Sequence, residues 1–123
     1  MTIQGGRMFD GTTIQMLHVA LDGLAMRQRV VADNIANVET PGFLAGRVQF
    51  EQELRAAIEK RESPAQVRPT VERSLEPTRI NGNNVNLDQQ VLTHMDTTLR
   101  YQMMLRILDG KYNGIRRVIG GQA

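Results

Sequence analysis

Two long segments at opposite ends of the chain carry apolar residues at helical spacing, and they constrain the fold more than any other feature. The first segment repeats an apolar residue every seven positions in two registers offset by four, with one polar interruption. Such heptad spacing predicts a long amphipathic helix with a narrow apolar stripe. The two registers are Leu17, Leu24, Val31 and Val38, and Ile14, Leu21, Gln28 and Ile35.

The second segment begins near Val85 and ends at Gly120 and Gly121. Its stripe consists of Leu87, Val91, His94, Thr98, Tyr101, Leu105, Leu108, Tyr112, Ile115 and Ile119. A flanking row widens this apolar face through Leu92, Met95, Leu99 and Met103. Such a face is wider than a two-helix seam needs, which predicts packing against several neighbours.

The apolar period of the first helix stops within residues 34–43, and the residue types found there also end a helix. Pro41 lacks an N–H and pushes the preceding residue away from helical geometry, and Gly42 permits a positive φ for a reversal of the chain. Asn34 and Asn37 lie one turn apart, where their amides can satisfy carbonyls and loop groups. The sequence therefore predicts a specified corner rather than a frayed helix end.

The middle of the chain has a mixed character. Apolar spacing predicts a short third helix over about residues 48–61, and three prolines break residues 62–82 into extended pieces. Those pieces either lie on a helix surface or form short strands. Residues 81–84 have the composition of a turn. In the first helix, Gly23 lets a neighbouring segment approach closely.

The expected fold is mainly α, with the long N- and C-terminal helices packed as an antiparallel coiled-coil layer. A short third helix and an extended middle segment, with or without strands, complete it. The expected division is a lead-in and long helix (1–40), a corner, short helix and linker (41–83), and the second long helix (84–123). Residues 1–11 are glycine-rich and polar, which indicates a flexible lead-in.

Composition narrows the function classes. The 123 residues include no cysteine, which excludes disulfides and thiolate metal sites, and only 4% are aromatic, which suits helix-on-helix packing. The first residues do not read as a cleavable leader, and no apolar run is long enough to span a bilayer. The net charge is +2, with basic residues gathered after Arg100. A solvated helix face explains that tail better than nucleic-acid binding does, because no aromatic platform accompanies it.

No catalytic, cofactor-binding or metal-binding constellation stands out. His18 and His94 lie far apart and neither has a second ligand at metal-site spacing. The carboxylates of Asp22, Asp33 and Asp88 are isolated along the sequence, and no glycine-rich phosphate loop follows a strand. The seven methionines favour adaptable packing at an interface.

The two apolar stripes predict an assembly interface. Two helices cover only one side of each other, so apolar rows on an isolated chain would form a large exposed patch, and such patches mark interaction surfaces. We therefore expect both rows to stay exposed until sister molecules cover them. The predicted interface residues are Leu17, Leu21, Leu24, Val31, Ile35, Val38, Leu99, Tyr101, Leu105, Leu108, Tyr112 and Ile115.

Residues 34–43 resemble the signature of the flagellar basal-body rod and hook family, a pattern of the type A-N-x-x-T-P-G-[YF]. The pattern is met by Ala36, Asn37, Thr40, Pro41, Gly42 and Phe43, and Asn34 precedes it. Residues 50–54 resemble the short helix after the signature. A second motif is similar to the G-N-N-V-x-L-D segment of proximal-rod members, through Gly82, Asn83, Asn84, Val85, Leu87 and Asp88. Residues 44–46, a stretch that is usually basic in the family, are apolar, and Thr97 stands where asparagine is common.

The resemblance implies a structural subunit of the proximal rod that polymerises through its terminal helices and transmits torque from the motor to the hook and filament. It implies no enzymatic activity and no cofactor. Implied partners are copies of itself, FlgC-like rod subunits, a FliE-like adaptor at the membrane ring and the flagellar type III export apparatus. The implied location is the rod crossing the periplasm, reached without a cleaved signal peptide. The alternatives are the sister subunit FlgC and a small helical secretion adaptor or chaperone.

Overall fold

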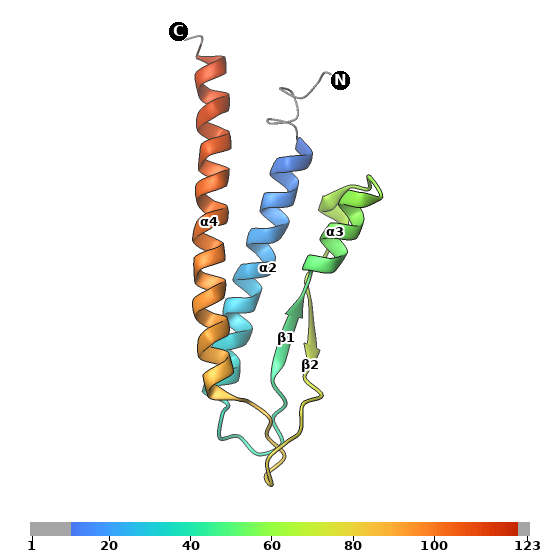
Figure 1. The fold of residues 1–123 in the computed structure, drawn as a ribbon, viewed down its shortest axis with the longest axis vertical. Helices are drawn as coiled ribbons and strands as arrows, with labels where there is room; N and C mark the ends of the chain where they lie inside the picture. The colour runs from blue at the N-terminus through green and yellow to red at the C-terminus, as the bar shows by residue number, and fades with distance from the viewer. Residues whose placement is uncertain (1–10, 121–123) are drawn as a thin grey trace.

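The computed structural model describes residues 11–120, which form two long helices and a small hairpin unit (Figure 1). Helices α2 (Gly11–Ala36) and α4 (Leu87–Ile119) run antiparallel side by side. Between them in sequence come β1 (Gly46–Gln49), α3 (Glu51–Glu59), the 3-10 helix η1 (Pro64–Gln66) and β2 (Thr70–Arg73), and residues 46–73 are what we call the hairpin unit. The mainly α fold with paired terminal helices is confirmed. The predicted lead-in lies outside the described residues except for Gly11, which begins α2.

The sequence alone left open whether the middle segment forms strands, and the hairpin unit contains them. β1 and β2 pair antiparallel, with Gly46 opposite Arg73 and Val48 opposite Val71. The prediction of a helix from residue 48 was wrong at its start, because Val48 belongs to β1 and α3 begins only at Glu51. The alternation of buried Gly46, exposed Arg47 and buried Val48 has the period of a strand.

Helix α2 lies at the centre of the fold. Its Leu17 and Leu21 pack with Leu108 of α4. Other positions of α2 pack against the hairpin unit: Val19 contacts Ala57 and Val67, and Leu24 contacts Val48 and Phe50. Leu17, Leu21, Leu24 and Val31 are consequently buried within a single chain. This corrects the expectation that the N-terminal row stays exposed until sister molecules cover it, because the hairpin unit covers the side of α2 that α4 leaves open.

Two glycines allow the hairpin unit to approach α2 closely. A Cβ on Gly23 would lie 2.4 Å from the Phe50 ring, and a Cβ on Gly46 would lie 2.9 Å from Val30. Both distances are shorter than side-chain contacts permit, so these positions require glycine. The close neighbour expected at Gly23 is therefore the aromatic ring that precedes α3.

Helix α4 starts two residues later than the predicted Val85. The Val85 side chain is buried, and its N–H donates to Asn83 Oδ1 at 2.7 Å, which holds it in the loop. Asn86 is the N-cap, and its side chain accepts from the Gln89 N–H at 3.1 Å. Gly120 forms the C-cap, as the glycine pair predicted. The polar interruption Gln28 contacts Thr98 of α4 at 3.5 Å, which pairs polar groups across the seam.

Candidate assembly site

Asn34 joins α2 to β1 and α4 from a fully buried position, with 0% of the residue exposed. Its Oδ1 accepts from the Gly46 N–H at 2.8 Å, and its Nδ2 donates to the Gly46 carbonyl at 3.0 Å and to Gln90 Oε1 at 2.9 Å. The side chain thus satisfies both backbone groups of Gly46 on the strand edge that faces α2. The Asn34 amide therefore makes the hydrogen bonds to Gly46 that a neighbouring strand would otherwise make.

Asn83 joins the two sequence motifs directly. Its Nδ2 donates to the carbonyls of Asn37 and Thr40, at 2.9 and 2.8 Å. These carbonyls lie just beyond the end of α2, where helices leave backbone acceptors without partners. Because Asn83 also accepts from the Val85 N–H, one buried side chain connects the end of α2 to the start of α4.

Asn84 ties the hairpin unit to the same junction. Its Oδ1 accepts from the Ala45 N–H at 2.7 Å, and its Nδ2 donates to the carbonyls of Ser74 and Glu76 at 3.2 and 3.0 Å. Asn84 therefore links the segment that enters β1 to the segment that leaves β2. Together with Asn34 and Asn83 it forms what we call the asparagine junction.

Two glycines with positive φ meet inside this junction. Gly42 has φ 74° and Gly82 has φ 83°, both in the left-handed region that favours glycine. A Cβ on Gly82 would lie 3.2 Å from the Gly42 Cα, so the two turns pack backbone against backbone. The Gly42 N–H donates to the Asn81 carbonyl at 2.8 Å. The reversal predicted at Gly42 is present, and its partner turn comes from the second motif.

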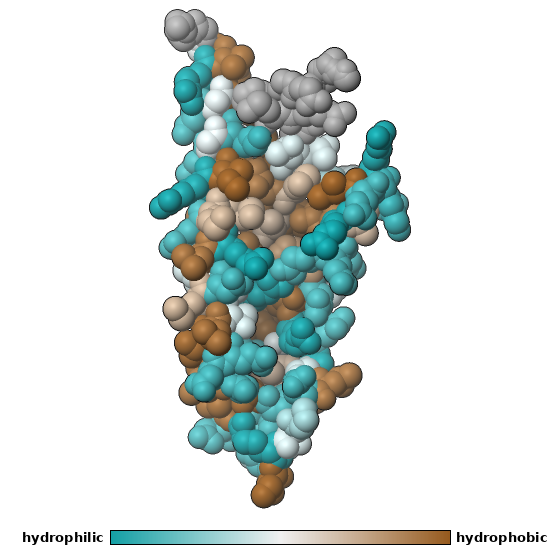
Figure 2. Space-filling model, in the orientation of Figure 1, coloured by the Kyte–Doolittle hydropathy of each residue, from teal (hydrophilic) through white to brown (hydrophobic). Residues whose placement is uncertain are grey.

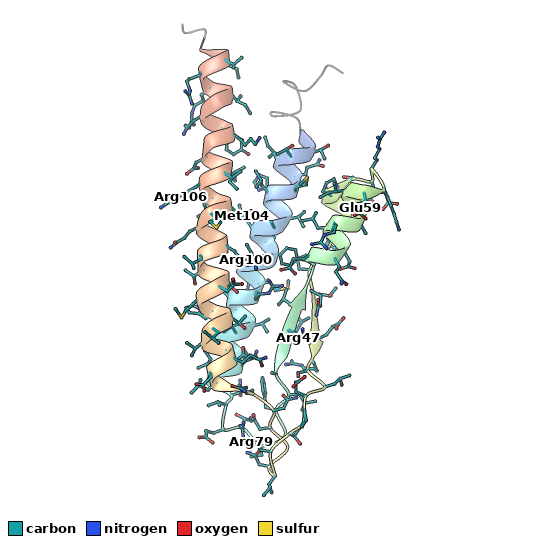
Figure 3. All side chains as sticks on the ribbon, viewed as in Figure 1. Arg47, Glu59, Arg79, Arg100, Met104 and Arg106 are labelled. Carbon is teal, nitrogen blue, oxygen red and sulfur yellow. The ribbon has the colours of Figure 1, made fainter. Side chains whose placement is uncertain are left out.

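Arg79 is a junction residue that the sequence patterns did not reveal. Its Nη1 donates to the Val85 carbonyl, and its Nη2 donates to the Val38 carbonyl and to Asn83 Oδ1, each at 2.7 Å. Figure 3 labels Arg79 at the end of the molecule where the loops meet. A planar guanidinium with five donors suits this cluster of oxygens. The available signal was an arginine just before the turn at residues 81–84.

The other motif residues lie at the edge of the junction. Thr40 Oγ1 donates to Asn37 Oδ1 at 3.0 Å, and Phe43 is half-buried beneath the Arg73 guanidinium, which lies 5.5 Å from the ring centre. The exposed members of the two motifs are Ala36, Thr40, Pro41, Gly42, Leu87 and Asp88. The motifs therefore combine buried residues that close the junction with residues that remain on the surface.

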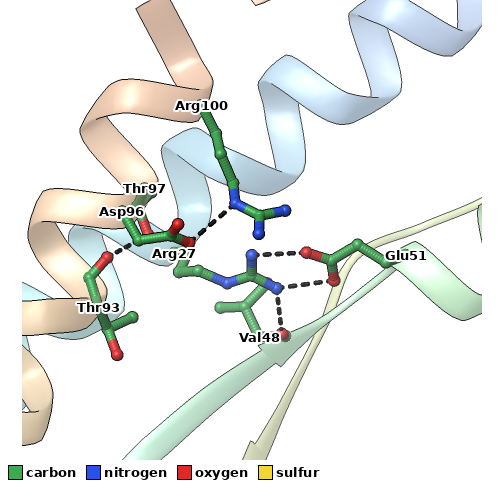
Figure 4. A network of polar contacts seen from close by, with 7 residues as sticks. All are labelled: Arg27, Val48, Glu51, Thr93, Asp96, Thr97 and Arg100. Atoms are coloured by element: carbon green, nitrogen blue, oxygen red, sulfur yellow. Dashed lines mark hydrogen bonds and ion pairs between the residues drawn. The ribbon is translucent and has the colours of Figure 1, made fainter.

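A second polar contact holds the hairpin unit against α2 (Figure 4). Arg27 donates to both Glu51 carboxylate oxygens, at 2.6 and 2.8 Å, and to the Val48 carbonyl at 2.8 Å. Its guanidinium also lies 5.2 Å from the centre of the Phe50 ring. The hydrogen bond from Arg27 lowers the pKa of Glu51 below the ordinary value of 4.5, against an opposing effect of burial.

Helix α4 has a face that no described residue covers. Gln90, Thr97 and Leu108 are buried, whereas Leu92, Met95, Leu99 and Met103 are 66%, 57%, 61% and 58% exposed. Leu92 and Leu99 each follow a buried residue by two positions, which is about 200° of helical rotation, so they point away from α2. Figure 2 shows hydrophobic patches along this side of α4. We call these four residues the outer row.

The structure divides the twelve predicted interface residues into three groups. The buried residues are Leu17, Leu21, Leu24, Val31 and Leu108, and the half-buried ones are Ile35, Val38, Tyr101 and Ile115. Only Leu99, Leu105 and Tyr112 lie on open surface. The residues of the predicted set that a neighbour can reach in this conformation therefore lie on α4, and Leu99 belongs to the outer row.

The histidines and carboxylates do not gather. His18 Nε2 lies 3.4 Å from the Tyr112 hydroxyl, and His94 is exposed on α4. Within residues 11–120, no group of three or more His, Cys, Asp or Glu residues is placed to hold a metal ion. No helix in this described part of the chain combines the length and the apolar character needed to cross a membrane.

Comparison with known proteins finds one consistent set of relatives. The family model described as "Flagella basal body rod protein" matches residues 17–43, which span most of α2 and the corner. FlgB of Escherichia coli (strain K12) is 32% identical over 120 residues, covering 81% of this chain and 87% of that protein. FlgB of Bacillus subtilis (strain 168) is 29% identical over 126 residues, covering 93% and 97%. FlgB of Salmonella typhimurium (strain LT2) is 32% identical over 122 residues, covering 83% and 88%.

A helical fold whose corner lies within the family match, together with these relatives, defines a structural subunit, and the chain belongs to the family of flagellar basal-body rod proteins. Within that family it is FlgB-like over most of its length. As a rod protein it is a component of the flagellar basal body, where it assembles with other rod components.

Proposed function

We propose that this chain polymerises with copies of itself and with other rod subunits through the outer row of α4, as a FlgB-type subunit of the proximal rod. The four exposed apolar side chains of the outer row are the observation that carries this proposal. Fully burying each such side chain contributes about 1.5–3 kcal/mol, and contiguous apolar rows of this kind mark contact surfaces.

We propose further that the rod transmits torque from the motor to the hook and filament. Helices that interlock through apolar ridges resist sliding and twisting, because packed interiors have low compressibility. The asparagine junction supports this role, since Asn34, Asn83 and Asn84 fix the ends of both helices and the hairpin unit with hydrogen bonds. A subunit of this kind passes on torque without unfolding at its turns.

The remaining partners follow from likeness to the family. We propose FlgC-like subunits as neighbours in the rod, a FliE-like adaptor at the membrane ring, and the flagellar type III apparatus as the route of export to the periplasm-spanning rod. The second motif supports a FlgB-type rather than a FlgC-type position, because residues 82–88 resemble the G-N-N-V-x-L-D segment of FlgB-type subunits and the relatives compared above are FlgB proteins. The proposed role is structural, with no catalytic step.

The test is complementation of a strain that lacks the chromosomal copy. The double variant Leu99→Asp with Met103→Asp places two charges in the outer row, so we expect the subunit to be exported but swimming to be lost. Gln102→Asp is a single-charge control, because Gln102 is exposed on the same helix beside the row and the substitution adds one charge of the same sign. Normal swimming of the double variant would refute assembly through the outer row.

A further inference from the structure

The two ends of the long axis both expose apolar side chains. At one end, the loop that follows β2 presents Leu75 and Ile80 entirely to solvent, with exposures of 97% and 108%. Figure 2 shows hydrophobic colour at this extremity, which is the end that Arg79 marks in Figure 3. At the other end, the last turn of α4 exposes Val118 and Ile119 at 71% and 78%. We call residues 75–82 the tip and residues 116–119 the α4 end.

The tip is held firmly despite its exposure. The Glu76 N–H donates to Ser74 Oγ at 3.1 Å, and the Glu76 carbonyl accepts from Asn84. The Arg79 guanidinium spans three oxygens, and the Asn81 carbonyl accepts from the Gly42 N–H. Leu75 and Ile80 are therefore projected from an ordered loop. A loop whose backbone is already ordered loses little backbone conformational entropy when a partner covers it.

The two ends also carry opposite charge among the described residues. Glu39, Glu76 and Asp88 are exposed around the tip. Arg79 turns its guanidinium onto backbone and amide oxygens, and Arg73 donates to the Leu44 carbonyl and lies over the Phe43 ring. Exposed Arg116 and Arg117 flank Val118 at the α4 end. The acidic residues around the apolar tip complement the basic residues around the apolar α4 end. A contact between the tips of two copies would instead bring carboxylates together.

We propose that the tip of one copy docks against the α4 end of a second copy, head to tail along the long axis. Leu75 and Ile80 pack on Val118 and Ile119, and the acidic residues beside the tip face Arg116 and Arg117. This inference rests on the proposed function, because it supplies the axial contact between subunits that already associate through the outer row. A head-to-tail contact does not close on itself, so it extends an assembly along one direction.

Cross-linking in solution tests this contact, because the chain has no cysteine of its own. Purified Ile80→Cys is mixed with purified Val118→Cys under mild oxidation, at concentrations where the parent protein sediments as an assembly. We expect a mixed disulfide dimer to form about tenfold faster than with Gln52→Cys in place of Val118→Cys. Gln52 is an exposed position on α3 and reports random collisions. Equal rates, or faster dimerisation of Ile80→Cys with itself, would overturn the proposal.

Charge-reversal variants provide a second test of the same contact. Arg116→Glu with Arg117→Glu in the Val118→Cys protein should slow the mixed cross-link about tenfold, and Glu39→Lys with Glu76→Lys in the Ile80→Cys protein should restore it. Failure of the restoring pair would contradict the charge pairing. If the parent protein sediments but the Ile80→Cys and Val118→Cys proteins give no mixed cross-link, the axial contact is overturned and the proposed function is left standing. If the parent protein does not sediment and the two cysteine variants do not cross-link, both the axial contact and the proposed function are overturned.

Discussion

Asparagine is the residue type that closes this fold, because its amide offers donors and an acceptor that match unpaired backbone groups. Asn34 satisfies the strand edge at Gly46, and Asn83 satisfies carbonyls beyond the end of α2. Both side chains are fully buried, so each hydrogen bond replaces contacts with water that the backbone has lost. The turn is thus determined by side-chain amides rather than by regular secondary structure.

Removing one of these amides should be costly. Asn34→Ala leaves the Gly46 N–H, the Gly46 carbonyl and Gln90 without their partner, so we expect the free energy of unfolding to fall by about 2–4 kcal/mol. Asn37→Ala is the control, because the Asn37 side chain makes its hydrogen bonds on the surface, and we expect a loss below about 1 kcal/mol. Urea unfolding measures both values. Equal losses would contradict a special role for the buried amide.

The contact between Arg27 and Glu51 should make stability depend on pH. Because the folded pKa of Glu51 is lowered, the contact stabilises the fold above the ordinary value of 4.5, and this contribution is lost as the pH falls through the lower folded pKa. Glu51→Gln should therefore be less stable than the parent near neutral pH, and the difference should shrink below about pH 4.5.

Urea unfolding at a series of pH values measures this difference. Glu53→Gln removes the same charge from the same helix, outside the Arg27 contact, and should keep the parent's acid-dependent loss. A gap between the parent and Glu51→Gln that stays constant from neutral to acidic pH would count against the ion pair as its cause.

Local signals identified part of the junction in advance. The proline and glycine at residues 41 and 42 predicted the corner, and residues 81–84 predicted a turn. The sequence did not show that these two turns contact each other, since Asn83 and Asn37 lie 46 positions apart. Arg79 was missed for the same reason, because its acceptors come from both sides of the junction and only the folded chain brings them together.

At the scale of elements, the heptad period predicted α2 as a helix but could not identify what covers it. The stripe is covered by α4 on one side and by Val48 and Phe50 of the hairpin unit on another. β1 has four residues and directly precedes α3, so the apolar spacing of the helix concealed the strand. The sequence predicted that a neighbour could approach Gly23 closely, but it did not identify Phe50 as that neighbour.

The two helical glycines should respond oppositely to alanine. A Cβ on Gly110 would meet no neighbouring atom within 4 Å, so Gly110→Ala should raise the free energy of unfolding by about 0.5–1 kcal/mol. Gly23→Ala gains the same helix propensity but forces a methyl group against the Phe50 ring, so we expect a net loss of about 1–3 kcal/mol. Thermal and urea unfolding of both variants give the signs. Stabilisation by Gly23→Ala would disprove the tight seam between α2 and the hairpin unit.

At the scale of the whole molecule, the chain buries one apolar face of each long helix and leaves the outer row of α4 open. The two apolar stripes predicted that apolar surface would remain for neighbours, and of the two long helices it is α4 that exposes such a row. The buried N-terminal row means that each subunit carries its own core into the assembly. In the proposed assembly, association buries the outer row of α4 on a fold that is already closed by the asparagine junction.

Methionine oxidation tests the claim that neighbours cover the outer row. Met95 and Met103 lie in the row and are more than half exposed, whereas Met26 and Met104 pack against the core. Peroxide should oxidise Met95 and Met103 readily in the purified protein, because the reaction follows exposure, and Met26 and Met104 serve as internal references. In isolated basal bodies we predict that Met95 and Met103 become as slow as the reference methionines. Oxidation of Met95 and Met103 at the same rate in basal bodies as in the purified protein would contradict the account.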